Sequence, residues 1–253
     1  MIKLKTNNWT MDNIETVIFD KDGTFIDLHF FWGKITEMRV NKILEEFNLS
    51  NDYFNQLCLF LGYDFVEKKM IPEGITALYS RAKIIKIFNN NLKTLGVYTD
   101  EINIEKLFDL VSVEFNKNIG NYIKLIDEAI DFIKNLYQKG VKLGVVTSDS
   151  VVTTNLTLKK YNLEKYFEVI IGRESSVEIK ESGIPTKMAL EFLNAKPDST
   201  VMIGDAPMDY ISAKKAGIDN VILVASGQID KLTLQKTTPY VVESLKDVEC
   251  ILT

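Results

Sequence analysis

The stretch Thr-Val-Ile-Phe-Asp-Lys-Asp-Gly-Thr-Phe-Ile-Asp, residues 16–27, decides how this chain folds. Its apolar run, Val17–Phe19, is typical of a buried strand. The run ends in two carboxylates, Asp20 and Asp22, whose mutual repulsion and partial desolvation are costly unless a cation or a reaction uses them. Gly23 allows the backbone to turn sharply there. An ordinary Asp-Gly turn after a strand is the alternative interpretation.

The composition is that of a soluble globular protein. The 253 residues are 46% hydrophobic and 26% charged, which fits one large domain or two modest ones. The net charge of −5 provides no basic surface for nucleic acid. No apolar run approaches the roughly 20 residues of a membrane helix, and the N-terminus lacks a signal-peptide core. Cys58 and Cys250 are few and far apart, as in a reducing compartment. We expect a cytoplasmic protein that binds neither nucleic acid nor membranes.

Helical patterns dominate residues 29–118, soon after the first strand. Apolar residues recur there at helical spacing, and no segment predicts a sheet. The predicted helices span residues 35–47, 54–61, 75–88 and 101–115. Residues 1–15 form a polar lead-in without clear periodicity. We expect an all-helical domain of residues 29–118, inserted into a domain that comprises residues 1–28 and 119–253.

From residue 125 onward, short apolar strands alternate with helices. The predicted strands cover residues 141–146, 167–171, 200–203, 221–224 and 241–242. The predicted helices cover residues 126–139, 151–161, 185–193, 208–216 and 244–251. This alternation is typical of an α/β fold with a Rossmann-like parallel sheet covered on both faces. Ligands bind beyond the carboxyl ends of such strands, so polar residues at those ends should share one crevice.

Polar residues follow four of these strands. They are Asp20 and Asp22, then Thr147 and Ser148, then Lys180, and finally Asp205 and Asp209. Each has an ordinary alternative: Thr147 can cap a helix, Lys180 can be solvated, and Asp209 can stabilise a helix N-terminus. Their joint occurrence at the strand ends of one sheet favours a shared site.

The acidic residues of this set suit phosphoryl transfer. Asp20, Asp205 and Asp209 offer hard oxygen ligands of the kind that select Mg²⁺. A bound cation offsets their repulsion and neutralises charge on a phosphoryl group. Asp20 can act as a nucleophile that forms an aspartyl-phosphate. Asp22 can protonate the leaving oxygen and then activate water as a general base.

The remaining residues complete this chemistry. Thr147 can donate its hydroxyl to the phosphoryl oxygens, and Lys180 can offer them a positive charge. His29 is the single histidine, which argues against zinc or Ser-His-Asp chemistry. The sequence contains no phosphate-binding P-loop and no strand-linked G-x-G-x-x-G motif.

These motifs resemble those of the haloacid dehalogenase (HAD) superfamily. The similarity covers the Asp-Lys-Asp-Gly-Thr motif at residues 20–24, Thr147, the run 201–217 with its Gly-Asp pair, and the tail 221–245. The resemblance is to the branch of phosphoglycolate phosphatases and beta-phosphoglucomutases. It implies a HAD-like α/β core with an inserted helical cap of the C1 type.

The resemblance also implies roles for single residues. Asp20 would be the nucleophile; its side chain and the backbone carbonyl of Asp22 would bind Mg²⁺, with Asp205 completing the metal site and Asp209 supporting it. The implied substrate-binding residues are Gly23, Thr147, Ser148, Lys180 and Arg81. The cap would select the substrate, and its candidate residues are His29, Trp32, Arg39 and Arg81. Core packing or solvent exposure is the alternative for each of these cap residues.

One motif departs from the family pattern. The motif lysine is often followed by proline in the family, whereas Lys180 precedes Glu181, and Lys187 is a second candidate. We prefer Lys180 because its spacing to the following helix fits the family. Lys187 falls inside a predicted helix and is expected to face solvent.

The acid at position 22 narrows the reaction class. Dehalogenases and phosphonate-cleaving members that resemble this fold lack an acid there, and the related ATPases need membrane helices. We expect a Mg²⁺-dependent phosphatase, monomeric or homodimeric, that hydrolyses a small phosphomonoester metabolite through an aspartyl-phosphate on Asp20. A phosphomutase of the beta-phosphoglucomutase type is the first alternative. A non-catalytic member that binds a phosphorylated ligand or a protein partner is the second.

Overall fold

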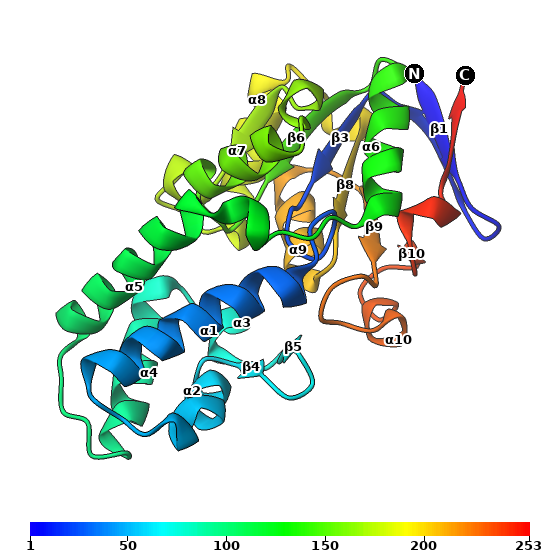
Figure 1. The fold of residues 1–253 in the computed structure, drawn as a ribbon. Helices are drawn as coiled ribbons and strands as arrows, with labels where there is room; N and C mark the ends of the chain where they lie inside the picture. The colour runs from blue at the N-terminus through cyan, green and yellow to red at the C-terminus, as the bar shows by residue number, and fades with distance from the viewer. The chain divides into compact units, whose positions relative to one another are not determined.

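The computed structural model describes residues 1–253, which divide into two compact units (Figure 1). The core unit comprises Met1–Asp27 and Lys124–Thr253. The helical unit comprises Leu28–Ile123. No helix of the structure combines the length and the apolar character needed to cross a membrane.

The core unit contains a six-stranded parallel sheet in the order β10-β9-β8-β3-β6-β7. Its strands are β3 (Thr16–Phe19), β6 (Lys142–Val146), β7 (Val169–Ile171), β8 (Thr200–Gly204), β9 (Asn220–Val224) and β10 (Val241–Val242). Phe19, at the end of β3, is in register with Val145 on one side and Ile203 on the other. The ends of the three central strands are therefore level, and the predicted α/β fold class is confirmed.

Helices cover this sheet and complete its core. They are α6 (Asp127–Gln138), α7 (Val151–Lys160), α8 (Ile184–Phe192), α9 (Pro207–Ala216) and α10 (Lys231–Leu234). Every residue of β3 and β8 is buried, as expected for strands covered on both faces. Pro207 begins α9, and Gly217 ends it in the left-handed conformation, with φ at 90°.

A second sheet joins the two ends of the chain. It is antiparallel, in the order β11-β1-β2, and consists of β1 (Ile2–Lys5), β2 (Thr10–Ile14) and β11 (Glu249–Leu252). The predicted helix at 244–251 is wrong: a 3-10 turn, Leu245–Asp247, leads into β11 there. These strands are short and show no clear local pattern of apolar residues. β11 is stabilised by pairing with β1, at the opposite end of the sequence (Figure 1).

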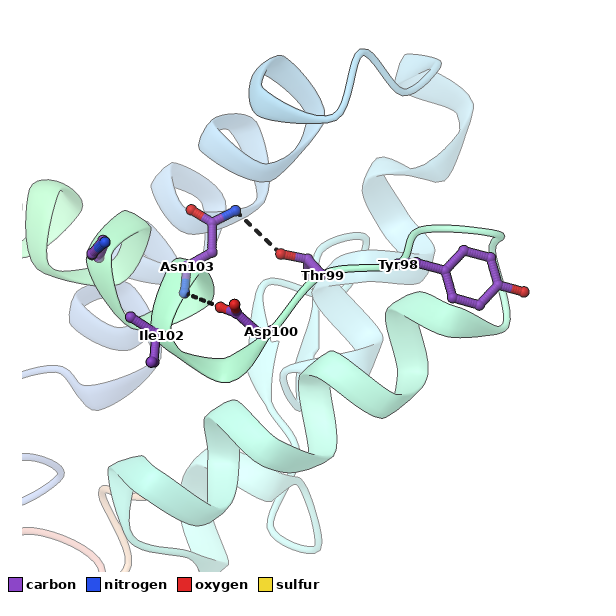
Figure 2. Close-up of a pocket in the computed structure, with 6 residues that line it drawn as sticks. Tyr98, Thr99, Asp100, Ile102 and Asn103 are labelled. Atoms are coloured by element: carbon purple, nitrogen blue, oxygen red, sulfur yellow. Dashed lines mark hydrogen bonds between the residues drawn. The ribbon is translucent and has the colours of Figure 1, made fainter.

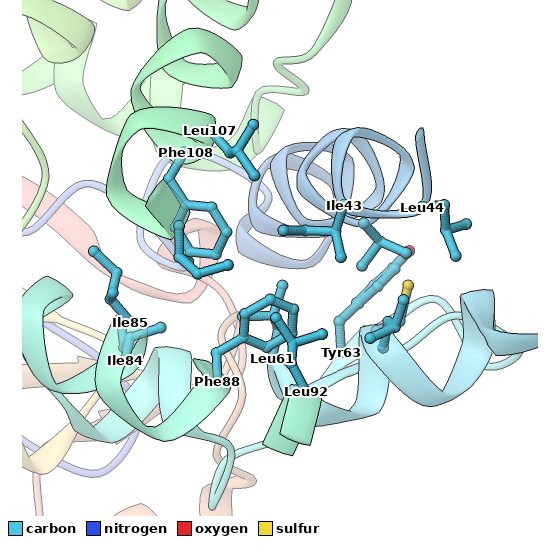
Figure 3. Packing of buried hydrophobic residues seen from close by; sticks show 14 of the residues in the cluster. Ile43, Leu44, Leu61, Tyr63, Ile84, Ile85, Phe88, Leu92, Leu107 and Phe108 are labelled. Carbon is cyan, nitrogen blue, oxygen red and sulfur yellow. The ribbon is translucent and has the colours of Figure 1, made fainter. Parts of the chain in front are cut away.

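The helical unit contains α1 (Leu28–Glu46), α2 (Phe54–Phe60), α3 (Ile75–Leu78), α4 (Arg81–Lys93) and α5 (Glu101–Lys117). Their apolar faces form one core (Figure 3). Two details differ from the predicted all-helical domain. A short hairpin of β4 (Tyr63–Asp64) and β5 (Lys69–Met70) follows α2. The predicted helix 75–88 is interrupted because Tyr79 and Ser80 adopt extended backbone conformations between α3 and α4.

Candidate active site

The loops after β3 and β6 begin in positions held by the sheet itself. The backbone N–H of Asp20 donates to the carbonyl of Ile203 at 2.8 Å, and that of Thr147 donates to Ile171 at 2.9 Å. The first residue beyond β3 and the first residue beyond β6 are therefore still hydrogen-bonded to a neighbouring strand. This bonding fixes the direction in which the following side chains leave the sheet.

Three buried carboxylates meet at this edge. Asp20, Asp205 and Asp209 each offer an oxygen, and these oxygens all lie within 4.8 Å of one another. Asp209 is anchored at the N-terminus of α9: its Oδ2 accepts the backbone N–H groups of Asp205 and Ala206, which precede the helix, both at 3.1 Å. The predicted convergence of these three acids is present in the structure.

Lys180 supplies the positive charge of this cluster. It lies on a 3-10 turn, is buried, and places Nζ 2.5 Å from Oδ1 of Asp20 and 2.6 Å from Oδ1 of Asp209. Lys187, the second candidate for the motif lysine, is exposed on α8. Tertiary structure therefore brings Lys180, and not Lys187, to the carboxylates.

The residues of this cluster fit a divalent metal ion. Burial raises the pKa of Asp20 to about 7, against the opposing effect of Lys180, and burial also raises the pKa of Asp205 well above its usual range. Lys180 offsets one of the three carboxylate charges when all are ionised, which leaves two negative charges in a buried site. Carboxylate oxygens are hard ligands, so a divalent cation would balance this charge.

The turn that follows Asp20 is closely packed against Asp205. Gly23 has φ at 87°, and a Cβ atom there would collide with the carboxylate of Asp205. Its carbonyl accepts the hydroxyl of Ser226 at 2.6 Å, and its N–H donates to Ile26 at 2.8 Å. Asp22 lies on the same turn with Oδ1 2.8 Å from Nζ of Lys21. Gly23 therefore has a structural reason to be glycine in addition to the predicted contact with substrate.

Thr147 and Ser148 occupy the loop after β6. Thr147 is buried, and its Oγ1 accepts the backbone N–H of Asp149 at 3.1 Å, which leaves the hydroxyl proton to be donated. Ser150, and not Thr147, caps α7, because its side chain accepts the N–H of Thr153. Ser148 is exposed, with Oγ 3.8 Å from the sulfur of Met208.

The predicted substrate-selecting residues belong to the helical unit. Arg81 forms an ion pair with Asp109 at 2.5 Å in that unit. His29 accepts the backbone N–H of Met70 through Nδ1 at 3.1 Å, and Arg39 is buried with its guanidinium 4.5 Å from the ring of Phe108.

A surface pocket of the helical unit is a poorer candidate for chemistry. It has a volume of about 530 Å³ and surrounds the start of α5, lined by Tyr98, Thr99, Asp100, Ile102, Asn103 and Lys106 (Figure 2). Its two hydrogen bonds belong to the helix start: Asp100 accepts the N–H of Asn103, whose side chain donates to Thr99. These hydrogen bonds therefore explain the pocket as a consequence of how α5 begins.

Lys21 and Asp149 lie in the predicted strand-end stretches, but the sequence assigns neither a role. Lys21 is fully buried and lies 2.8 Å from Asp149, an ion pair that joins the loops after β3 and β6. The signal that could have found it is the lysine between the two aspartates, since a charged side chain adjoining a buried strand needs a partner.

Comparisons with known proteins agree with this architecture. Residues 17–224 match the family model described as haloacid dehalogenase-like hydrolase. A putative pyrophosphatase PpaX of Caldanaerobacter subterraneus subsp. tengcongensis is 28% identical over 235 residues, which is 92% of this chain and 91% of the relative. Pyrophosphatase PpaX of Anoxybacillus flavithermus is 26% identical over 81% of each chain.

Solved structures share the fold at low sequence identity. A predicted phosphoglycolate phosphatase from Haemophilus somnus has a TM-score of 0.72 at 18% identity, covering 94% of this chain and 97% of that one. A putative beta-phosphoglucomutase from Thermotoga maritima has a TM-score of 0.66 at 19% identity, covering 92% of this chain and 96% of that one.

Proposed function

Because this chain belongs to the haloacid dehalogenase-like hydrolase family, we propose that it is a Mg²⁺-dependent phosphatase that works through an aspartyl-phosphate. The observation that carries this proposal is the cluster of Asp20, Asp205 and Asp209 with Lys180 at the carboxyl edge of the sheet. The cluster combines a buried carboxylate nucleophile with oxygen ligands for a divalent cation.

In the first half-reaction, an oxygen of Asp20 attacks the phosphorus atom of the substrate. The new bond joins Asp20 to phosphorus, and the bond from phosphorus to the leaving oxygen breaks. Asp22 gives its proton to that oxygen as the general acid. Lys180 orients the Asp20 carboxylate, because its amine contacts the carboxylate oxygen at 2.5 Å.

In the second half-reaction, water attacks the phosphorus of the aspartyl-phosphate. Asp22, now a carboxylate, accepts the proton of the water as the oxygen–phosphorus bond forms. The bond between Asp20 and phosphorus breaks, which releases phosphate and restores both aspartates.

The remaining polar groups stabilise the charge of the transferring phosphoryl group. Thr147 would donate its hydroxyl proton to a phosphoryl oxygen, with Ser148 as a further contact. Mg²⁺, held by Asp20, the backbone carbonyl of Asp22 and Asp205 with support from Asp209, would supply neutralisation of phosphoryl charge. Each of these contacts gains strength as charge builds up on the phosphoryl oxygens.

We propose that the substrate is a small phosphomonoester and that the helical unit is the cap that selects it through residues such as Arg81. Inorganic pyrophosphate is a second candidate, because the relatives matched over most of the chain carry the name pyrophosphatase. The mutase alternative has only a likeness of fold in its favour.

The test is phosphate release from a panel of compounds, first with Mg²⁺ and then with EDTA. The panel contains sugar phosphates, phosphoglycolate, nucleoside monophosphates, p-nitrophenyl phosphate and inorganic pyrophosphate. We expect release that needs Mg²⁺ and disappears in Asp20→Asn. Release that persists in Asp20→Asn would refute the covalent mechanism. No release from any compound, with no phosphate trapped on the protein, would refute the proposed activity.

A further inference from the structure

Lys21, which lies between Asp20 and Asp22 in the sequence, is completely buried. Its side chain is 0% exposed, and Nζ lies 2.8 Å from Oδ1 of Asp22 and 2.8 Å from Oδ2 of Asp149. A buried ammonium group carries a desolvation penalty that only close charged partners offset. We refer to Lys21, Asp22 and Asp149 together as the Lys21 network.

Asp149 is a rigid partner because its other polar groups are engaged. Its Oδ1 accepts the N–H of Ser150 at 2.7 Å, and its carbonyl accepts the N–H of Arg173 at 2.9 Å. Its own N–H donates to Oγ1 of Thr147 at 3.1 Å. The contact between Lys21 and Asp149 therefore connects the first motif with the loop that presents the Thr147 hydroxyl.

The backbone around Lys21 is equally constrained. Its carbonyl oxygen accepts the N–H groups of Thr24 at 3.3 Å, and of Phe25 and Ile26 at 3.1 Å each. These bonds close the turn on which Asp22 lies. Asp22 is thus held twice, by the turn of the main chain and by the amine of Lys21.

We propose that Lys21 is a positioning residue for phosphoryl transfer, which holds the carboxylate of Asp22 in place while its own amine is fixed by Asp149. The inference rests on the proposed function, in which Asp22 exchanges protons with the leaving oxygen and with water. Lys21 acts through Asp22 and makes no contact with the phosphoryl group. The competing account is that Lys21 only stabilises the fold.

A double-mutant cycle separates these two accounts. The kcat/KM of the best substrate in the panel is measured for wild type, Lys21→Met, Asp22→Ala and the combined variant. We expect Lys21→Met to lower kcat/KM by about tenfold or more, with the roughly 10²–10⁴-fold contribution of general acid–base catalysis as the upper limit. In the Asp22→Ala background the same substitution should have little further effect on kcat/KM, because the carboxylate that Lys21 positions is absent.

The dependence on the leaving group provides a second measurement. p-Nitrophenolate leaves without much help from an acid, whereas an alkyl oxygen needs a proton. Lys21→Met should therefore raise the ratio of kcat/KM for p-nitrophenyl phosphate to that for an alkyl phosphate. Lys142→Met is the matched control, since Lys142 is a half-buried lysine of β6 whose amine donates to the carbonyl of Leu193. We expect no change of the ratio in that variant.

A second variant protects the test against misfolding. Lys21→Met leaves two carboxylates without their ammonium partner, whereas Lys21→Met combined with Asp149→Asn removes one charge of each sign. Asparagine retains an oxygen to accept the N–H of Ser150. If Lys21→Met fails to fold, this double variant takes its place in the cycle and in the ratio.

The outcomes are distinct. Equal losses with both substrates, or additive effects in the cycle, would overturn the positioning role while the phosphatase activity of the wild type stands. Unchanged activity in a folded Lys21 variant would overturn it as well. A wild type that neither hydrolyses the panel nor takes up phosphate would overturn the proposed function, and the role of Lys21 with it.

Discussion

The substitution Asp205→Asn should stabilise the metal-free protein while removing its response to Mg²⁺. Asp205 is buried, and its carboxylate lies within 4.8 Å of oxygens of Asp20 and Asp209. Two charges at that distance repel by about 3 kcal/mol at an effective dielectric constant of about 20. Lys180 offsets part of this repulsion, because it contacts both Asp20 and Asp209. Asparagine keeps the shape of the side chain and removes the charge.

The expected magnitude follows from this geometry. Removal of one of the three carboxylate charges should raise the free energy of unfolding of the metal-free protein by about 1–3 kcal/mol, after the offset by Lys180. For a chain of this size, this corresponds to an increase in Tm of about 2–12 °C. Mg²⁺ at a concentration of 100 times its Kd should stabilise the wild type by about 2.7 kcal/mol, and Asp205→Asn should lose most of this gain.

The assay is thermal unfolding of both proteins at pH 8, in EDTA and across a Mg²⁺ titration, followed by circular dichroism. Asp131→Asn is the matched control, because Asp131 is an exposed aspartate of α6 paired with Lys134. Its stability should change by less than about 0.5 kcal/mol, and its response to Mg²⁺ should match the wild type. A lower metal-free Tm for Asp205→Asn, or an undiminished Mg²⁺ shift, would refute the account of three repelling carboxylates that share a cation.

Three further predictions address single residues. Asp20→Asn should fold but release no phosphate and trap no acid-stable phosphoryl label after quenching; a labelled variant would contradict the assignment of the nucleophile. Gly23→Ala should lower the free energy of unfolding by about 1–3 kcal/mol in urea titrations, because of the φ of 87° and the collision with Asp205. An unchanged midpoint would be evidence against that packing. Burial raises the pKa of Cys58 to about 12, so its thiol should resist a thiol reagent at pH 8 until the protein is unfolded. Rapid labelling of Cys58 in the native protein would count against its burial.

The central strands could be predicted from the sequence because each is a continuous apolar run. Val17–Phe19 and the run at 200–203 are buried on both faces, so their local composition alone identifies them. The site followed from the same logic, since the carboxyl ends of parallel strands lie at one edge of the sheet. Asp20, Asp205 and Asp209 could be predicted to meet without any knowledge of distances.

The errors lie where local pattern is weak. The strand β11 was predicted as a helix because its residues have no partner nearby in the sequence and pair with β1 at the other end of the chain. The hairpin of β4 and β5 has two residues in each strand, too few to show a period of two. The helix predicted at 75–88 is interrupted at Tyr79 and Ser80, where the sequence contains no proline or glycine that would predict a break.

The sequence by itself determined the α/β class, the family and the acidic residues of the candidate site, because these depend on short motifs and local periodicity. The tertiary structure supplies the contact of Lys180, the lysine favoured by its spacing in the sequence, with the acids, and it leaves Lys187, seven residues further on, exposed. It also decided the pairing of Lys21 with Asp149. That contact joins residues 128 positions apart, and only the register of β3 with β6 brings their loops together.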